Sequence, residues 1–234
     1  MYNLLITGAS QGIGAAIVKH FAQQSAMTIF ALARNECKLN ELASFCNRAS
    51  NGSKVIPVAV DLDQADYELL VRRLMVYTAT FDVVIHNAGF MVNKPFESIQ
   101  PDDFNSVFST NVKVPFFLTQ ALLPVLKAGA HVLAISSMGG LQGSQKYPGL
   151  SVYSSAKGAL AVLMESLAAE LSDRQISFNA LALGSVQTEM LQKAFPGYHA
   201  PVEPARMAEF IAWFALNGQK VMNGKILPVA SSNP

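Results

Sequence analysis

The sequence predicts an α/β fold in which a doubly wound parallel sheet of about seven strands carries helices on both faces. Three observations support this prediction. Short apolar runs alternate with longer helical patterns along the whole chain. A glycine-rich turn directly follows the first apolar run. The length of 234 residues suits one large domain, and no linker or repeat divides it. We therefore expect one Rossmann-like domain over residues 1–234.

The predicted elements follow from hydrophobic periodicity. Strand candidates lie at 3–7, 28–33, 54–60, 82–86, 131–136, 176–183 and 225–229. Helical patterns lie at 13–24, 36–48, 64–78, 102–127, 151–173 and 204–217. Because Pro228 cannot donate a hydrogen bond to a sheet ladder, we expect the last strand at an edge.

The helix at 151–173 has two apolar faces. Large residues at helical spacing should pack on the sheet: Leu160, Leu163, Met164, Leu167 and Leu171. The second face carries smaller residues: Ala161, Val162, Ala168 and Ala169. Another subunit is the natural partner of such a face, so we expect a homodimer or homotetramer paired through this helix and the helix at 102–127. A loop of the same chain is the alternative cover.

Composition argues against several classes of function. Lys and Arg total 17 against 16 Asp and Glu, so we expect no nucleic-acid partner. No apolar run reaches the length of a membrane helix and the first residues lack a signal-peptide pattern, so we expect a cytoplasmic protein without a membrane partner. Cys37 and Cys46 have no His nearby to complete a ligand set, and we expect no metal site.

The glycine-rich turn at 7–14 joins the first strand to the first helix. Glycines allow the backbone to approach a pyrophosphate, and the helix N-terminus supplies N–H donors. We expect cofactor contacts from Gly8, Ser10, Gln11, Gly12, Ile13 and Gly14. An S-adenosylmethionine site could place a similar loop here, so this motif alone does not settle the cofactor.

The end of the second strand bears on the choice of dinucleotide. NAD sites usually have Asp or Glu there, to accept bonds from the ribose 2′-hydroxyl. This chain instead has Arg34 followed by Asn35. Because a guanidinium can hold a 2′-phosphate, we expect both residues to contact the cofactor and NADP(H) to be preferred over NAD(H). A solvated arginine at a helix start is the alternative.

Tyr153 and Lys157 are candidates for proton transfer. They lie four residues apart at the start of a predicted helix, so both side chains share one face. We expect the ammonium of Lys157 to lower the pKa of the Tyr153 phenol. Ser137 ends the predicted fifth strand, where open parallel sheets bind ligands, and its hydroxyl can bond a carbonyl oxygen.

Taken in order, these motifs resemble the short-chain dehydrogenase/reductase superfamily over nearly the full chain. Four residues match the catalytic set of that family: Asn111, Ser137, Tyr153 and Lys157. The resemblance implies an oxidoreductase that moves a hydride between nicotinamide and a small carbonyl or alcohol. Tyr153 would be the general acid/base, Lys157 would bind the nicotinamide ribose, Ser137 would orient the substrate oxygen, and Asn111 would hold a water.

The resemblance also implies further cofactor contacts. These are Asp61 and Leu62 at the adenine, Asn87, Ala88 and Gly89 beside the cofactor, Tyr153 and Lys157, and Val186 and Thr188 near the nicotinamide. Some details depart from the family. The interval of sixteen residues from Ser137 to Tyr153 is longer than usual, and Ser136 is the alternative catalytic serine. Leu183-Gly184 replaces the usual Pro-Gly, which should loosen that turn.

We expect a compact, apolar, uncharged ketone or aldehyde as substrate. The segment 140–149 and a lid at about 190–200 should supply the wall, through Leu141, Tyr147, Met190, Leu191, Phe195 and Tyr198, with Phe90 and Met91 near the mouth. A short oxo acid is the alternative and would need Lys193 or His199 turned inward.

Three other functions fit the sequence less well. A catalytically silent dinucleotide-binding sensor or scaffold would not need the four catalytic residues. A methyltransferase gives no reason for the pair Tyr153 and Lys157. A sugar-nucleotide epimerase would need a larger region after Thr188.

Overall fold

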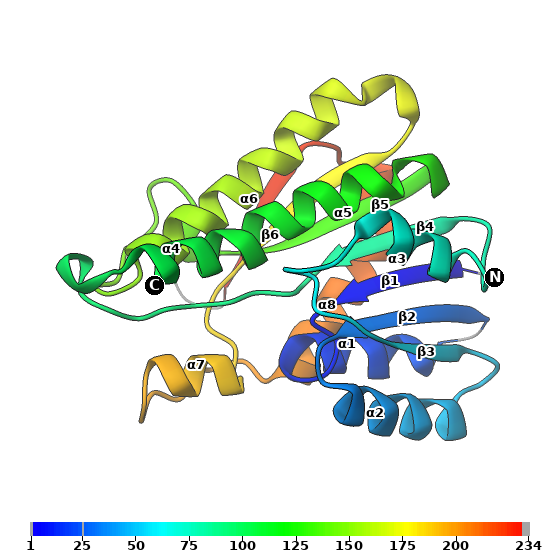
Figure 1. Cartoon of the computed structure of the whole chain (residues 1–234), viewed down its shortest axis with the longest axis horizontal. Helices are drawn as coiled ribbons and strands as arrows, with labels where there is room; N and C mark the ends of the chain where they lie inside the picture. The colour runs from blue at the N-terminus through cyan, green and yellow to red at the C-terminus, as the bar shows by residue number, and fades with distance from the viewer. Residues whose placement is uncertain (1, 25, 231–234) are drawn as a thin grey trace.

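The computed structural model describes residues 2–24 and 26–230, and a seven-stranded sheet forms its centre (Figure 1). Neighbouring strands are parallel throughout, in the order β3-β2-β1-β4-β5-β6-β7. The strands are β1 (Tyr2–Thr7), β2 (Met27–Ala33), β3 (Lys54–Ala59), β4 (Phe81–His86), β5 (Leu126–Ser137), β6 (Ser177–Leu183) and β7 (Lys225–Val229). The strand order reverses between β1 and β4, so a crevice opens at the carboxyl ends of these two strands.

Helices cover both faces of this sheet (Figure 1). One face carries α1 (Gly12–Ala22), α2 (Glu36–Ala49) and α8 (Pro204–Asn217). The other carries α3 (Tyr67–Leu74), α5 (Val114–Leu122) and α6 (Ser151–Glu170), with α4 (Pro101–Phe108) leading into α5. Successive strand residues enter opposite layers, as Leu4 and Leu5 do, and both are fully buried. The doubly wound fold is as predicted.

The predicted helix over 102–127 is wrong as one continuous α-helix. A π-helical turn, Ser109–Lys113, separates α4 from α5, and Val114 N–H bonds the carbonyl of Ser109. Pro115 lacks an N–H and cannot bond the residue four positions back, which favours the wider turn. A 3₁₀ turn at Leu123–Val125 then ends the helical segment, and Leu126 already belongs to β5.

Two expectations about packing have different outcomes. β7 lies at the edge of the sheet, as Pro228 predicted. The second face of α6 is only partly free, because Ala161 and Ala168 are buried in the core of the chain itself. A Cβ on Gly224 would lie 3.1 Å from the Cβ of Ala168, so small residues here allow the chain beside β7 to approach α6 closely.

The lid contains a short helix, α7 (Glu189–Ala194), whose first turn is capped by Thr188. It lies away from the sheet on the side where the crevice opens (Figure 1). None of the helices in the described ranges combines the length and apolar character that a membrane crossing requires. These same ranges also hold no cluster of three or more His, Cys, Asp or Glu side chains suited to a metal ion.

Candidate active site

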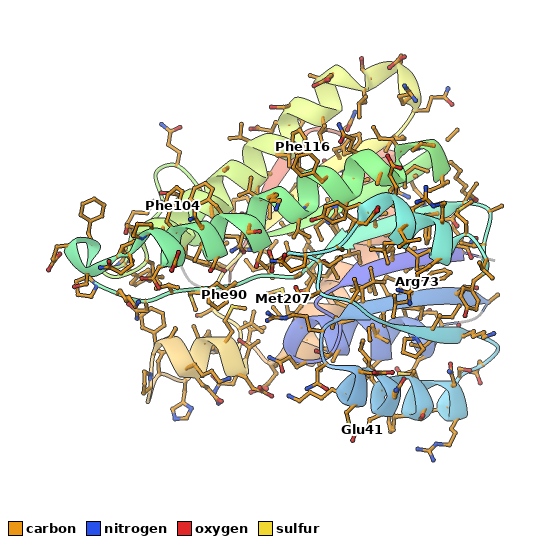
Figure 2. The ribbon with its side chains drawn as sticks, in the orientation of Figure 1. Glu41, Arg73, Phe90, Phe104, Phe116 and Met207 are labelled. Carbon is orange, nitrogen blue, oxygen red and sulfur yellow. The ribbon has the colours of Figure 1, made fainter. Side chains whose placement is uncertain are left out.

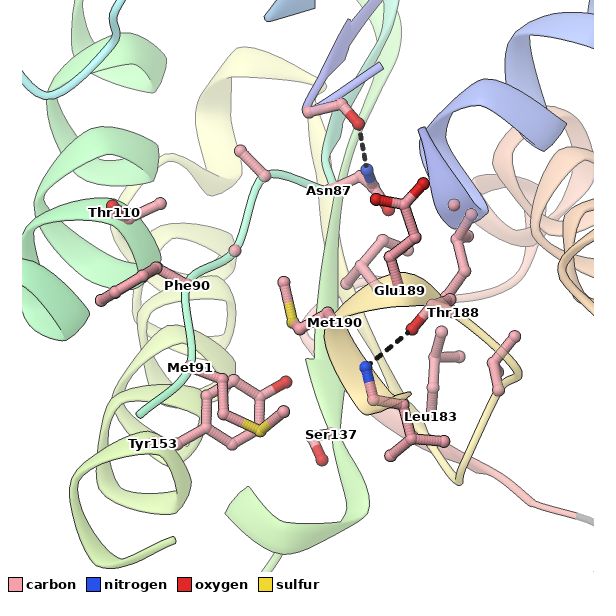
Figure 3. Close-up of a pocket in the computed structure, with 18 of the residues that line it drawn as sticks. Asn87, Phe90, Met91, Thr110, Ser137, Tyr153, Leu183, Thr188, Glu189 and Met190 are labelled. Carbon is pink, nitrogen blue, oxygen red and sulfur yellow. Dashed lines mark hydrogen bonds between the residues drawn. The ribbon is translucent and has the colours of Figure 1, made fainter. Parts of the chain in front are cut away.

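A cleft of about 550 Å³ opens at the carboxyl ends of the central strands and runs beneath α7 (Figure 3). Most of the sequence-predicted site residues line it: Gly8, Ser10, Gln11, Gly12, Ile13, Arg34, Asn35, Asp61, Leu62, Asn87, Ala88, Gly89, Ser137, Tyr153, Lys157, Val186 and Thr188. Gly14 and Asn111 do not line it. The cleft therefore gathers residues from the ends of six strands, β1 to β6, into one site.

The glycine-rich turn forms the floor at one end of the cleft. Gly8 and Gly12 have positive φ angles of 66° and 56°, which L side chains rarely adopt. A Cβ on Gly8 would lie 2.7 Å from the Cα of Ala88. The side chain of Gln11 makes no cap bond, so the first amides of α1 face the cleft as donors for an anion. This geometry fits a dinucleotide pyrophosphate.

Gly14 has a packing role behind this turn. A Cβ here would lie 2.2 Å from the carbonyl oxygen of Gly8 and 2.5 Å from Nδ2 of Asn87. Its expected cofactor contact is thus replaced by close packing of α1 against the turn.

Asn87 fastens the glycine-rich turn to the end of β4. Its Nδ2 donates to the carbonyl oxygens of Thr7 and Gly8 at 3.0 and 3.2 Å (Figure 3). The buried Thr7 hydroxyl accepts from the backbone N–H groups of Asn87 and Ala88 at 3.1 and 3.0 Å. These bonds hold the two walls of the cleft at a fixed separation.

The loop after β3 and the π-helical turn add polar groups to the cleft that sequence reasoning missed. Asp63 and Thr110 both line it, and the Thr110 hydroxyl donates to the Asp63 carboxylate at 2.9 Å. This bond joins the loop after β3 to the π-helical turn. The only signals in the sequence were the adjacent residues Leu62 and Asn111. Exposed Arg34, at the end of β2, also lines the cleft.

Ser137 and Tyr153 face the same part of the cleft, below α7 (Figure 3). The Ser137 hydroxyl lowers the pKa of Tyr153, and its oxygen accepts the N–H of Gly139 at 3.2 Å. Ser137 lies at the end of β5 and Tyr153 in the first turn of α6. Lys157, one turn further along α6, is buried, and its Nζ donates to the carbonyl oxygen of Ile135 at 2.8 Å. Three residues with polar side chains therefore meet where β5 and α6 pack together.

Burial governs the ionisation of this group. It raises the pKa of Tyr153 to about 12, and the nearby Ser137 hydroxyl offsets only part of that rise. Burial also lowers the pKa of Lys157 to about 8. The expectation of a lowered pKa for Tyr153 is wrong for the net value, because burial outweighs the effect of the Lys157 ammonium, which bonds the carbonyl of Ile135 and lies 5.7 Å from the phenol ring centroid. At neutral pH Tyr153 keeps its proton.

Asn111 belongs to the π-helical turn and is fully buried. It lies behind Gly89, as seen from the cleft. Its Nδ2 donates to the carbonyl oxygens of Phe90 and Val107 at 2.7 and 2.8 Å. Its Oδ1 has no protein partner. A Cβ on Gly89 would lie 3.2 Å from this Oδ1 and 3.5 Å from Nζ of Lys157, so both atoms border the same space. A buried, unpartnered acceptor here fits an ordered water.

Comparison with known proteins decides the family. The family model for short chain dehydrogenases matches residues 3–199. The chain is a short-chain dehydrogenase/reductase. It is 31% identical to a tropinone reductase homologue of Arabidopsis thaliana over 96% of its own length and 73% of the relative. This family assignment makes it an NAD(P)-dependent oxidoreductase.

Two solved structures carry bound dinucleotides. A short-chain dehydrogenase of Escherichia coli complexed with NADPH is 29% identical, with a TM-score of 0.88 and coverage of 97% of this chain and 95% of that one. A 3-oxoacyl-[acyl-carrier protein] reductase of Brucella melitensis with bound NAD is 27% identical, with a TM-score of 0.82 and coverage of 98% and 89%. The related structures thus include complexes with both cofactor types.

In this short-chain dehydrogenase/reductase the part of the cleft next to Tyr153 has a mostly apolar wall. The residues expected there include Phe90, Met91, Tyr147, Met190, Leu191, Phe195 and Tyr198, and all of them line the cleft. The expectation for Leu141 is wrong, since it lines a neighbouring hollow instead. Lys193 and His199 do not line the cleft, so no basic side chain of the lid faces the candidate substrate position.

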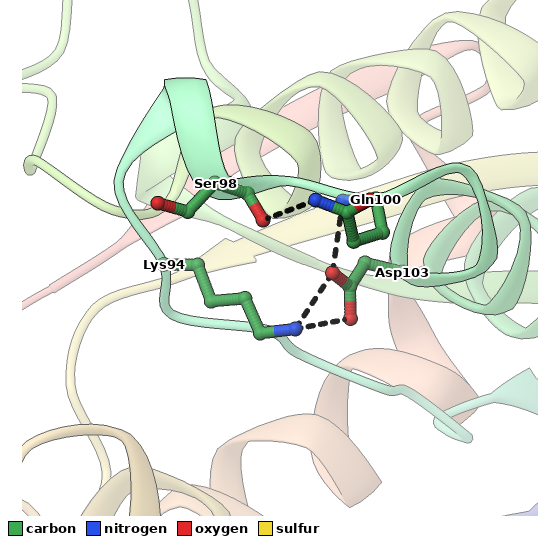
Figure 4. Close-up of polar contacts among 4 residues, drawn as sticks. All are labelled: Lys94, Ser98, Gln100 and Asp103. Carbon is green, nitrogen blue, oxygen red and sulfur yellow. Dashed lines mark hydrogen bonds and ion pairs between the residues drawn. The ribbon is translucent and has the colours of Figure 1, made fainter.

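Polar contacts fix the loop that carries Phe90 and Met91 (Figure 4). Nζ of Lys94 bonds both carboxylate oxygens of Asp103, at 2.7 and 2.8 Å. Oδ2 of Asp103 also accepts the N–H of Gln100 at 3.0 Å, within a capping box at the start of α4. The hydrogen bond from Lys94 holds the pKa of Asp103 below its usual value. The apolar wall is therefore anchored to a helix terminus.

Proposed function

We propose that this enzyme uses NADPH to reduce a compact, apolar, uncharged ketone or aldehyde to the alcohol. One observation carries the proposal: the Ser137 and Tyr153 hydroxyls lie in the part of the cleft whose wall is mostly apolar. Such a pocket suits a substrate with one oxygen to bond and little else that is polar. Across the whole chain, residues 1–234 would act as one cofactor-binding domain.

The proposed mechanism uses the protonated state of Tyr153. The cofactor, when bound, supplies the hydride to the carbonyl carbon. The Tyr153 phenol donates its proton to the carbonyl oxygen, so the product is the neutral alcohol. The Ser137 hydroxyl donates a second bond to this oxygen and stabilises the charge that develops there.

Two residues would restore the proton on Tyr153. The Lys157 ammonium lies beside the phenol ring and stabilises the transient phenolate. The unpartnered Oδ1 of Asn111 would hold a water between Lys157 and solvent. A silent sensor or scaffold remains the second candidate, but binding alone does not explain a buried ammonium and a buried acceptor arranged behind the phenol.

The preference for NADPH rests on Arg34. Its guanidinium lines the end of the cleft at the carboxyl end of β2, where an acidic residue would repel a 2′-phosphate. The relative with NADPH supports this preference, and the one with NAD shows that the family does not fix it. Fluorescence titration tests it: NADPH should bind more tightly than NADH, and Arg34→Ala should remove the difference.

The substrate class needs its own experiment. We propose to compare kcat/KM for neutral and anionic carbonyl compounds of matched size. Neutral ketones should be preferred, because Lys193 and His199 do not line the cleft. A strong preference for the anion that disappears in Lys193→Ala would instead identify an oxo acid as substrate.

We also propose a cytoplasmic homodimer or homotetramer. Phe104 on α4 and Phe116 on α5 belong to one helical layer (Figure 2), and each is more than two-fifths exposed at 46% and 43%. Val162 on α6 is exposed as well. An apolar surface of this kind suits a second subunit.

A further inference from the structure

Lys38 connects the two walls of the cofactor cleft. Its Nζ donates to Oε1 of Gln11 in the glycine-rich turn at 2.9 Å. The same Nζ lies 3.6 Å from Oε1 of Glu189, the first residue of α7. Both of these partners line the cleft. A single cation on α2 thus touches the glycine-rich turn and the lid.

The positive charge of Lys38 does not stabilise the helix that carries it. Lys38 is the third residue of α2, and Asn35 caps this helix by accepting the Lys38 N–H at 3.0 Å. A cation in the first turn opposes the helix dipole. Arg34 and Lys38 together place two cations at the carboxyl end of β2 against one carboxylate of the same turn, Glu36, and this excess favours an anion there.

The ion pair with Glu189 is easily exchanged. Its side chains are 42% and 52% exposed, and a pair at 3.6 Å in this setting adds little stability. A phosphate dianion offers more charge and more acceptor oxygens than one carboxylate. Lys38 would therefore bond a nearby phosphate in preference to Glu189.

We propose that Lys38 is a second cofactor-discriminating cation, and that it exchanges Glu189 for the 2′-phosphate of NADP(H). This inference rests on the proposed preference for NADPH. Glu189 competes with the phosphate for Lys38, so the carboxylate on the lid sets how strongly the enzyme distinguishes the two cofactors.

The test uses two probes that differ only in the phosphate: adenosine 2′,5′-bisphosphate and adenosine 5′-monophosphate. Calorimetry on the full chain measures both dissociation constants. Lys38→Met should weaken binding of the bisphosphate by about tenfold and leave the monophosphate unchanged. Glu189→Gln should tighten the bisphosphate a few-fold, and this gain should vanish in the double variant. Lys54→Met, at the opposite end of the sheet, controls for the loss of net charge.

The outcomes separate this inference from the proposed function. If the wild type does not distinguish the probes, the preference for NADPH and the role of Lys38 both fail. If Arg34→Ala abolishes the distinction but Lys38→Met does not alter it, only the role of Lys38 is wrong. A gain from Glu189→Gln that persists without Lys38 would show general repulsion by the carboxylate and would overturn the exchange.

Discussion

The Ser136 hydroxyl donates a 2.8 Å hydrogen bond to the backbone carbonyl of Lys157, whereas the adjacent Ser137 side chain lines the cleft with the Tyr153 phenol. Neighbouring residues on a strand point in opposite directions, so the two serines cannot share a role. Ser136 is buried and ties β5 to α6. Ser137 faces the cleft and is the serine that can reach a substrate.

This division predicts different results for two alanine variants. Ser137→Ala should lower kcat/KM by about a hundredfold with little change in stability, because it deletes one donor to the developing oxyanion. Ser136→Ala should lower the free energy of unfolding by about 1 kcal/mol, since it removes one buried hydrogen bond between β5 and α6. Urea unfolding and steady-state kinetics on both variants check this. A larger kinetic loss in Ser136→Ala would reverse the assignment.

Tyr153→Phe should reduce turnover by about 10²–10⁴-fold, because it removes the proton donor. It removes no charge and little volume, so the dissociation constant of NADPH should stay within about twofold. Lys157→Met should both lower turnover and weaken the binding of NADPH. Single-turnover reduction followed at the NADPH absorbance gives the rate, and fluorescence titration gives the dissociation constant of NADPH. Retention of more than a tenth of the wild-type rate in Tyr153→Phe would contradict acid catalysis by this phenol.

Much of the fold could be predicted because its signals are local. Strands such as β2, buried over all seven residues, appear as unbroken apolar runs. The turn at Gly8 and the edge position of Pro228 follow from backbone chemistry. The break in the helix at Pro115 was also a local signal, and it was overlooked in favour of the apolar periodicity around it.

Other features depend on contacts between distant segments. The pKa of Tyr153 depends on how deeply α6 is buried, which the spacing to Lys157 does not reveal. Trp213 has the spacing of a core residue beside buried Phe214, yet it is 59% exposed, because α8 buries only one side against the sheet. The contact between Lys38 and Glu189 joins residues far apart in the chain. No local pattern marks such pairs.

The lowered pKa of Lys157 predicts how the reaction depends on pH. Burial brings this pKa to about 8, so the ammonium is present below pH 8 and lost above it. Because kcat/KM reports groups of the free enzyme, its value for reduction should fall as pH rises through about 8. Lys157→Arg should move this fall to higher pH, since a guanidinium stays charged. A flat profile up to pH 10 would exclude a role for the ammonium.

Two buried histidines predict loss of stability in acid. Burial lowers the pKa of His86 and of His131 from 6.5 to about 4. Below pH 6.5 these histidines are protonated in the unfolded chain and remain neutral in the folded chain. The free energy of unfolding therefore falls as pH drops toward 4. At pH 5 each histidine lowers the free energy of unfolding by about 2 kcal/mol relative to its value at pH 7.5.

Urea unfolding at the two pH values measures this loss. Among the described residues, the His86 side chain bonds Thr119 alone, so the double variant His86→Leu, Thr119→Val removes one of the two contributions without leaving an unpaired hydroxyl. The loss between pH 7.5 and pH 5 should shrink by about 2 kcal/mol in this variant. An unchanged loss would mean that His86 is already protonated in the folded protein.

The exposed aromatic side chains on α4 and α5 predict the site of subunit pairing. Phe104 stacks on Phe108 within α4, and Phe116 lies edge-on to Phe117 in α5, so the exposed rings form pairs. A carboxylate placed among such rings would lose its hydration on association, and this cost exceeds what an interface can easily offset. Phe116→Asp should therefore convert the oligomer to a smaller species in light scattering at micromolar concentration.

Trp213→Asp, an equally drastic change on the opposite layer, is the control: dissociation by this variant alone would locate the main interface on α8. A wild-type chain that is monomeric under these conditions would rule out the oligomer altogether.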